Sequence, residues 1–137
     1  MSKTIGIVGS RRRNSKRDFD QLMDRFLEVY EDGDKLVSGG CYKGGDKFCE
    51  IIANKYNLTK ENNHLIIHKA EWDKYGKSAG FKRNTYIAED CDVLIAIVSK
   101  DRTGGTEDTI KKAERMGKKI IILEENDYDF DPLLEIL

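Results

Sequence analysis

Short apolar runs alternate with segments of helical periodicity along the chain. The apolar runs lie at residues 4–8, 35–37, 64–68, 92–98 and 119–123 and predict strands. Between them, the segments 19–30, 48–56, 78–89 and 106–116 carry the spacing of amphipathic helices. We expect a polar loop at residues 72–76, and a docked terminal helix or turn at residues 124–137, which are acidic and then apolar.

This alternation predicts the fold class. Parallel neighbouring strands need crossover connections, and such crossovers are right-handed. We therefore expect an α/β fold: a Rossmann-like, doubly wound parallel sheet of about five strands with helices on both faces. The run 92–98 is the longest apolar run and predicts a central strand that is buried on both faces.

Three glycine-containing turns follow predicted strands. They carry Gly9-Ser10-Arg11, the segment from Gly39 to Asp46, and Gly104-Gly105-Thr106. In parallel sheets, ligands bind beyond the carboxyl ends of the strands, so the three turns are expected to converge on one site. A glycine turn that leads into a helix exposes backbone N–H groups where an anion can bind. Taken alone, the segment from Gly39 to Asp46 also fits a plain flexible turn, since it matches neither a dinucleotide-binding fingerprint nor a Walker loop.

Length and composition narrow the class of protein. The 137 residues contain one proline and predict a single domain over 1–137. The 24 Lys and Arg residues balance 25 Asp and Glu residues, which disfavours a protein that coats nucleic acid. No apolar run approaches the ~20 residues of a membrane span. With no signal-peptide pattern before the first strand and an odd number of cysteines, we expect a cytoplasmic protein with reduced thiols.

Four motifs occur in an order that resembles the SLOG superfamily. They are Gly9-Ser10-Arg11, Ser38-Gly39-Gly40 followed by Gly45-Asp46, the pattern W-x-x-Y-G-x-x-A-G-x-x-R-N over 72–84, and Gly105-Thr106-x-x-Thr109. This superfamily is Rossmann-like and includes lysine-decarboxylase-like (LOG) and DNA-processing proteins. The chain looks nearest to the small stand-alone YpsA-related branch with its Gly-Ser-Arg signature. The resemblance covers roughly residues 5–123 and implies a domain that binds nucleotides or ADP-ribose-like ligands.

Several residues fit phosphate binding. Gly105-Thr106 at the head of a helix offers backbone N–H groups and a hydroxyl, although Thr106 also fits a plain N-cap. The Arg83 guanidinium, with Asn84 beside it, can hold a phosphate through two hydrogen bonds, and the alternative is a surface ion pair.

The three arginines after the first strand have different expected roles. Arg11, like Arg83, either binds a phosphate of the ligand or forms a surface ion pair. Arg12 and Arg13 could equally be solvated charges that attract any anion.

Two further features fit the nucleoside part of a ligand. Asp46, at the start of a helix, either accepts from a ribose hydroxyl or caps its helix. Trp72 and Tyr75 either form an aromatic wall on which a base stacks or belong to a loop that covers the sheet edge.

The resemblance also bears on catalysis. In phosphoribohydrolase relatives the loop reads Gly-Gly-x-Gly-Thr-x-x-Glu, and that Glu acts with an upstream Arg in cleaving a glycosidic bond. The matching position here is Thr109, which has no carboxylate. Glu107 and Asp108 point ~200° and ~100° away from it on a helix. The catalytic question therefore stays open, with Arg83, Glu107 and Asp108 as candidates, and we favour binding.

Metal and nucleophile chemistry are not expected. His64 and His68 would lie ~13 Å apart along a strand, too far for one metal ion. Cys41 fits a free structural thiol. We expect no metal and no cofactor.

Three function hypotheses follow. The first is binding or sensing of an ADP-ribose-like or nucleoside phosphate ligand. The second is a hydrolase of the N-glycosidic bond of a nucleoside monophosphate. The third is single-strand nucleic-acid binding by the basic residues of 11–17, which the balanced charge disfavours. A homo-oligomer stays open.

Overall fold

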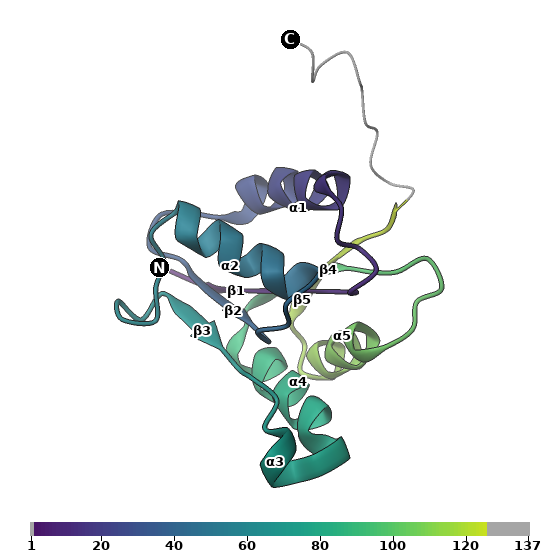
Figure 1. Ribbon diagram of the computed structural model, residues 1–137. Coiled ribbons are helices and arrows are strands. Elements are labelled where there is room, and N and C mark those ends of the chain that lie inside the picture. The colour runs from purple at the N-terminus through teal and green to yellow at the C-terminus, as the bar shows by residue number, and fades with distance from the viewer. Residues whose placement is uncertain (1, 126–137) are drawn as a thin grey trace.

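The structure is a computed structural model in which residues 2–125 are described. Five strands form one all-parallel sheet in the order β3-β2-β1-β4-β5 (Figure 1). They are β1 (Thr4–Gly9), β2 (Lys35–Ser38), β3 (Leu65–Ile67), β4 (Val93–Ile97) and β5 (Lys119–Leu123). The predicted α/β class and doubly wound parallel sheet are confirmed.

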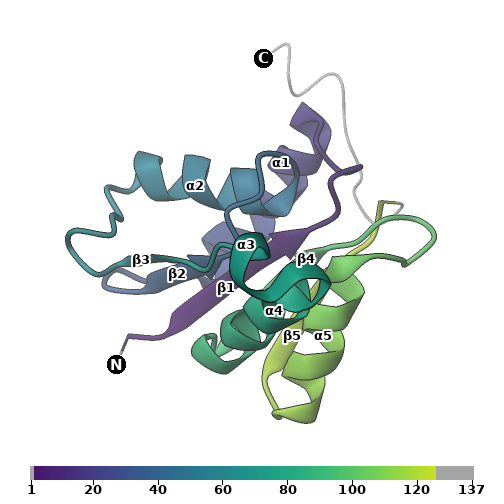
Figure 2. The ribbon, with the colours of Figure 1, turned by 60° about the horizontal axis from the view of Figure 1, so that its bottom comes forward.

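Four helices cover the two faces of this sheet. Helices α1 (Lys16–Val29) and α2 (Gly45–Lys55) lie on one face, and α4 (Ala79–Asp90) and α5 (Gly105–Arg115) lie on the other (Figures 1 and 2). The alternation of side chains along each strand divides the core between the faces. In β1, Ile5 and Ile7 pack with the cluster under α1 and α2, and Val8 packs with the cluster under α4 and α5.

Strand β4 is buried along its whole length, as its apolar run predicts. It pairs with β1 on one side and with β5 on the other. The middle position of the sheet, however, belongs to β1, which pairs with β2 and β4. Apolar length alone does not separate the two, because any strand with neighbours on both sides and helices on both faces is buried.

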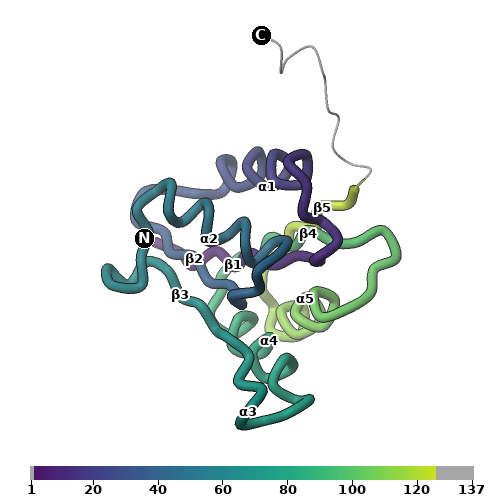
Figure 3. The backbone as a smooth tube through the Cα atoms, in the orientation of Figure 1, coloured from purple at the N-terminus to yellow at the C-terminus, as the bar shows by residue number. Residues whose placement is uncertain are grey.

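The expectation of a polar loop at residues 72–76 is wrong. Trp72–Tyr75 forms a single turn of helix, α3, and Gly76–Ser78 continues it as a 3₁₀ turn, η1. The backbone N–H of Gly76 donates to the carbonyl of Trp72, and Gly76 ends the turn with a φ of +57°. Segment α3 leads directly into α4, on the opposite side of the sheet from α1 (Figure 3).

Two further sequence-based expectations concern membrane-spanning segments and the end of the chain. None of the helices within 2–125 has the length and apolar content that crossing a bilayer requires. The terminal helix or turn expected at the end of the chain falls largely on 126–137, which lie outside the described residues.

Arg13 is a buried cation, which corrects the interpretation of it as a solvated charge. Only 1% of its surface is exposed. Its Nε donates to Asp18 at 2.7 Å, and its Nη1 donates to the carbonyls of Val98 and Leu123 at 2.8 and 2.9 Å. Its Nη2 donates to the side-chain oxygen of Gln21. The guanidinium therefore joins the β1–α1 turn to the carboxyl ends of β4 and β5.

The partner Asp18 is held as an anion. Burial alone would raise the pKa of Asp18, but hydrogen bonds from Arg13 and Ser15 outweigh it and lower that pKa. The stability that this pair supplies is therefore present above the ordinary aspartate pKa and is lost as the pH falls through the lowered value.

Replacing Arg13 is expected to destabilise the fold strongly. Arg13→Met leaves Asp18 and two strand-end carbonyls buried without their donor, and removing one partner of a buried pair costs about 3–5 kcal/mol. The matched control is Arg25→Met on α1, which removes the same charge from a half-exposed site and should change stability by about 0.5 kcal/mol or less. Urea unfolding followed by circular dichroism measures both. Equal midpoints for the two variants would contradict the structural role of Arg13.

Candidate functional site

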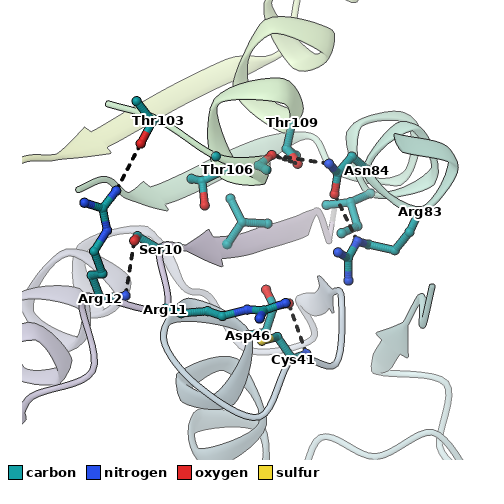
Figure 4. Close-up of a pocket in the computed structure, with 15 residues that line it drawn as sticks. Ser10, Arg11, Arg12, Cys41, Asp46, Arg83, Asn84, Thr103, Thr106 and Thr109 are labelled. Atoms are coloured by element: carbon teal, nitrogen blue, oxygen red, sulfur yellow. Dashed lines mark hydrogen bonds between the residues drawn. The ribbon is translucent and has the colours of Figure 1, made fainter. Parts of the chain in front are cut away.

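A cavity opens where the direction of strand order reverses. The chain runs outward from β1 to β2 and β3, then returns to the other side of β1 with β4 and β5. The turns after β1 and β4 therefore lead to helices on opposite faces and leave a crevice between them. A cavity of about 310 Å³ occupies this position (Figure 4).

The lining comes from the three turns, from the helix starts that follow two of them, and from α4. Val8, Gly9, Ser10, Arg11 and Arg12 come from the end of β1 and the turn after it, and Cys41 and Asp46 come from the β2–α2 connection and the start of α2. Arg83, Asn84 and Ile87 come from α4, and Thr103, Gly104, Gly105, Thr106 and Thr109 come from the β4–α5 turn and α5. The three glycine turns therefore converge on one cavity, as predicted.

Arg12 ties two of these turns together. Its guanidinium donates to both carboxylate oxygens of Asp101, at 2.9 and 2.7 Å, and also to Ser99 and Thr103. The hydrogen bond from Arg12 lowers the pKa of Asp101 well below its ordinary range, with further help from Ser99 and Thr103. Arg12 is thus neutralised within the protein and sets the distance between the β1 and β4 turns.

Asp46 organises the glycine turn of β2. Its two carboxylate oxygens accept from the Ser38 hydroxyl at 2.9 Å and from the Cys41 N–H at 3.1 Å. It therefore does not cap its own helix, which was one of the two roles its position suggested. Burial raises the pKa of Asp46, and these hydrogen bonds and the charge of Arg83 offset that only in part.

The Ser38 hydroxyl also contacts the Ile7 carbonyl, at 2.5 Å. One hydroxyl proton cannot serve both acceptors at once. Protonation of Asp46 would complete the set, because the acid would then donate to Ser38 while Ser38 donates to Ile7.

Arg83 and Asn84 connect the second turn to the third. Arg83 donates from Nη1 to the Gly39 carbonyl at 3.0 Å and from Nε to the Asn84 side-chain oxygen at 3.0 Å. Asn84 in turn donates to the Gly105 carbonyl at 3.3 Å and to Asp108 at 3.1 Å. Arg83 is not part of a surface ion pair, since within 2–125 its side chain bonds to uncharged groups.

The helix termini around the cavity have no side-chain caps. Gly104 is the N-cap of α5 and Gly44 is the N-cap of α2, and neither glycine can supply a side-chain cap, although the Gly44 N–H itself donates to the Asn14 side chain at 2.9 Å. Thr106 is therefore not an N-cap, and its side chain lines the cavity instead. Helix α1 differs, since Ser15 and Asp18 form a full capping box at its start. The Glu107 N–H donates to the Gly104 carbonyl at 3.2 Å, so the amide groups of Gly105 and Thr106 are the ones left for another acceptor.

Gly45 shows why α2 can begin so close to β1. A Cβ at this position would collide with the Gly9 nitrogen and the Val8 carbonyl group, all of them backbone atoms. The absence of a side chain lets the helix start rest directly on the strand end. Asp46, the next residue, is thereby brought to the cavity wall.

Three side chains at the start of α5 were considered for catalysis: the hydroxyl of Thr109 and the carboxylates of Glu107 and Asp108. Their environments differ. Thr109 is buried, lines the cavity and donates to the Gly105 carbonyl at 3.3 Å. Glu107 is paired with Arg102, with contacts of 2.8 and 2.9 Å, and Asp108 is bonded to Asn84 and paired with Lys112 at 2.9 Å. Neither Glu107 nor Asp108 lines the cavity.

Ten of the residues singled out from the sequence line the cavity: Gly9, Ser10, Arg11, Asp46, Arg83, Asn84, Gly104, Gly105, Thr106 and Thr109. Five do not. Ser38, Gly39 and Gly45 contact lining residues, Gly40 lies against Ile67 and Lys69 outside the lining, and Trp72 is 56% exposed and packs against Gly80. Sequence reasoning missed Arg12, Cys41, Thr103, Val8 and Ile87 as lining residues. Ile87 was detectable, because it follows Arg83 by one helical turn.

No metal site forms in the described part of the chain. Residues 2–125 contain no group of three or more His, Cys, Asp or Glu side chains close enough to hold an ion. His68 lies instead against Asp90, at 2.5 Å.

The comparisons with known proteins give no relatives. No family model, curated protein or solved structure matched this chain.

The three free cysteines are expected to differ in reactivity. Cys41 is partly exposed and lines the cavity, whereas Cys49 and Cys91 are fully buried. Burial raises the pKa of Cys91 to about 11 and raises that of Cys49 further, so neither thiolate forms near neutral pH. Ellman's reagent should therefore label one thiol rapidly in the folded protein and all three in urea. Cys41→Ser should abolish the rapid phase, and a rapid phase that persists in this variant would contradict the assignment.

Proposed function

We propose that this protein binds a nucleotide derivative, an ADP-ribose-like or nucleoside phosphate ligand, in the cavity at the switch point. The observation that carries the proposal is the glycine-headed N-terminus of α5 beside Arg11 and Arg83, which form no ion pair within 2–125. Helix N-termini favour anions through their free N–H groups and their dipole. The resemblance of the motifs to the SLOG superfamily points to the same ligand class.

The charges around the cavity support an anionic ligand. Arg12 is neutralised by Asp101, but the side chains of Arg11 and Arg83 have no ion-pair partner within 2–125. Arg11 extends along the same side of the cavity as Asp46 and Cys41 (Figure 4). The one carboxylate among the described lining residues is Asp46, which accepts from the Ser38 hydroxyl and the Cys41 N–H.

The shape of the cavity supports a ligand of nucleotide size. Its volume of about 310 Å³ lies at the lower end of small-molecule sites. Val8 and Ile87 supply apolar surface, and Thr106 and Thr109 supply hydroxyl groups. This mixture of apolar side chains, hydroxyl groups and cations suits a nucleoside that carries a phosphate.

The other two hypotheses have less support. Hydrolysis of an N-glycosidic bond needs a carboxylate near the reacting carbon, and both Glu107 and Asp108 are engaged outside the cavity. Single-strand binding by residues 11–17 loses Arg13 to burial and Arg12 to its pair with Asp101.

Nucleotide binding is expected to require the phosphate group. AMP and ADP-ribose should raise the melting temperature, since ligand at about 100 times its Kd adds about 2.7 kcal/mol of stability, whereas adenosine should have little effect. Gly105→Val should fold normally, because the space beside Gly105 holds only Asn84 at 3.8 Å, yet its side chain would fill the phosphate position. Equal ligand-induced shifts in this variant and the parent would refute the proposed site.

Arg83 is expected to contribute directly to affinity. Arg83→Gln should weaken AMP binding about 10- to 100-fold, since a hydrogen bond to a charged group contributes about 1.5–3 kcal/mol. Arg115→Gln, at the far end of α5 and outside the cavity, removes the same charge as a control. Isothermal titration calorimetry measures both, and similar losses in the two variants would indicate only a general charge effect and contradict the role of Arg83.

No release of adenine from AMP is expected. Thr109 has a neutral hydroxyl where a carboxylate would be needed, and a general acid or base is worth about 10²–10⁴ in rate. Chromatography of free adenine over hours tests this. Steady turnover by the parent that is lost in Arg83→Gln and in Glu107→Gln would place the protein among hydrolases instead.

A further inference from the structure

A second cavity, of about 560 Å³, lies beside the first, over the end of β3 and the starts of α3 and α4. Its lining is basic and aromatic. The residues that define its chemistry are Lys60, Lys69, Lys82, Arg83, Tyr75 and Tyr86. None of the three lysines was singled out from the sequence, because they are far apart along the chain.

The positive charge of this cavity is not balanced by its own carboxylates. Within 2–125, Lys60, Lys69 and Lys82 form no ion pair, and Lys82 lies over the Tyr75 ring with its ammonium 4.6 Å from the ring centre. Glu71 is the one carboxylate among the described lining residues. Four cations against one carboxylate make the cavity attractive to a phosphate.

The aromatic side chains offer a stacking surface. Tyr86 is 45% exposed and contacts His68 with a spacing of 5.5 Å between ring centres. The Tyr75 ring is already flanked by Lys74 and Lys82, at 5.0 and 4.6 Å. Tyr86 therefore has the more available face, and nucleobases stack on aromatic rings of this kind.

The two cavities meet at Arg83 and the Gly39-Gly40 turn. Arg83 lines both. A Cβ at Gly39 would lie 2.6 Å from the Arg83 Nη1, on the side of the first cavity, and a Cβ at Gly40 would lie 2.9 Å from Ile67, on the side of the second. The Gly39-Gly40 turn thus packs against side chains of both linings, and a ligand that extends past Arg83 can contact both cavities.

We propose that the two cavities form one site for a dinucleotide, a ligand with two nucleotide units joined through phosphate. This inference rests on the proposed nucleotide binding in the first cavity. One phosphate lies at the start of α5. The phosphate that joins the two units lies between Arg83 and the cluster of Lys60, Lys69 and Lys82, and the base of the second unit stacks on Tyr86.

The test compares AMP with the 5′-phosphorylated dinucleotide pApA by isothermal titration calorimetry at one ionic strength. For the parent, pApA should bind at least about ten-fold more tightly than AMP, because the second phosphate adds charge-assisted hydrogen bonds. The double variant Lys69→Gln/Lys82→Gln should lose this advantage and keep the parent's affinity for AMP. The control Lys77→Gln/Lys111→Gln removes two charges outside both cavities and should retain the advantage.

The outcomes separate this inference from the proposed function. Binding of AMP with an equal Kd for pApA, or an advantage that survives Lys69→Gln/Lys82→Gln, overturns the dinucleotide site and leaves nucleotide binding intact. Binding of neither ligand refutes the proposed function, and this inference with it. A single strand of about 20 nucleotides that binds much more tightly than pApA, with several proteins per strand, would indicate a nucleic-acid groove instead and would also overturn the dinucleotide site.

Discussion

The burial of one guanidinium, that of Arg13, is the constraint on which the candidate site depends. A cation can stay in the interior only when its donors are satisfied, and here they reach Asp18, Gln21 and the carbonyls at the ends of β4 and β5. These bonds hold the β1–α1 turn over the two strand ends. Because Arg11 and Arg12 precede Arg13 in that turn, fixing Arg13 also fixes their positions at the cavity.

The helix starts differ in how their first N–H groups are satisfied. Helix α1 satisfies its own first N–H groups with Ser15 and Asp18, and Asp18 is also the anion that holds Arg13. Helices α2 and α5 begin with glycine and have no such side-chain cap. The helix that secures the turn is thus internally satisfied, whereas α5, which borders the cavity, has no side-chain acceptor at its first N–H groups.

The fold could be predicted from the sequence because its signals are local and periodic. Apolar runs and helical spacing located every strand of the sheet and its four covering helices, and the topology of parallel sheets brought the glycine turns together. The different roles of Arg11, Arg12 and Arg13 could not be predicted, since three identical adjacent residues carry no sign of which one is buried. Nor could the second cavity, because Lys60, Lys69 and Lys82 come together only through the tertiary fold.

The bare backbone contact at Gly45 has a consequence for how this protein can change over evolutionary time. Even the single methyl group of alanine would collide with main-chain atoms of β1, which cannot rotate away as a side chain can. Helix α2 would then have to shift, and Asp46 would move with it. The exposed face of α2 is free to drift, but descendants of this sequence that keep the cavity must also keep this glycine.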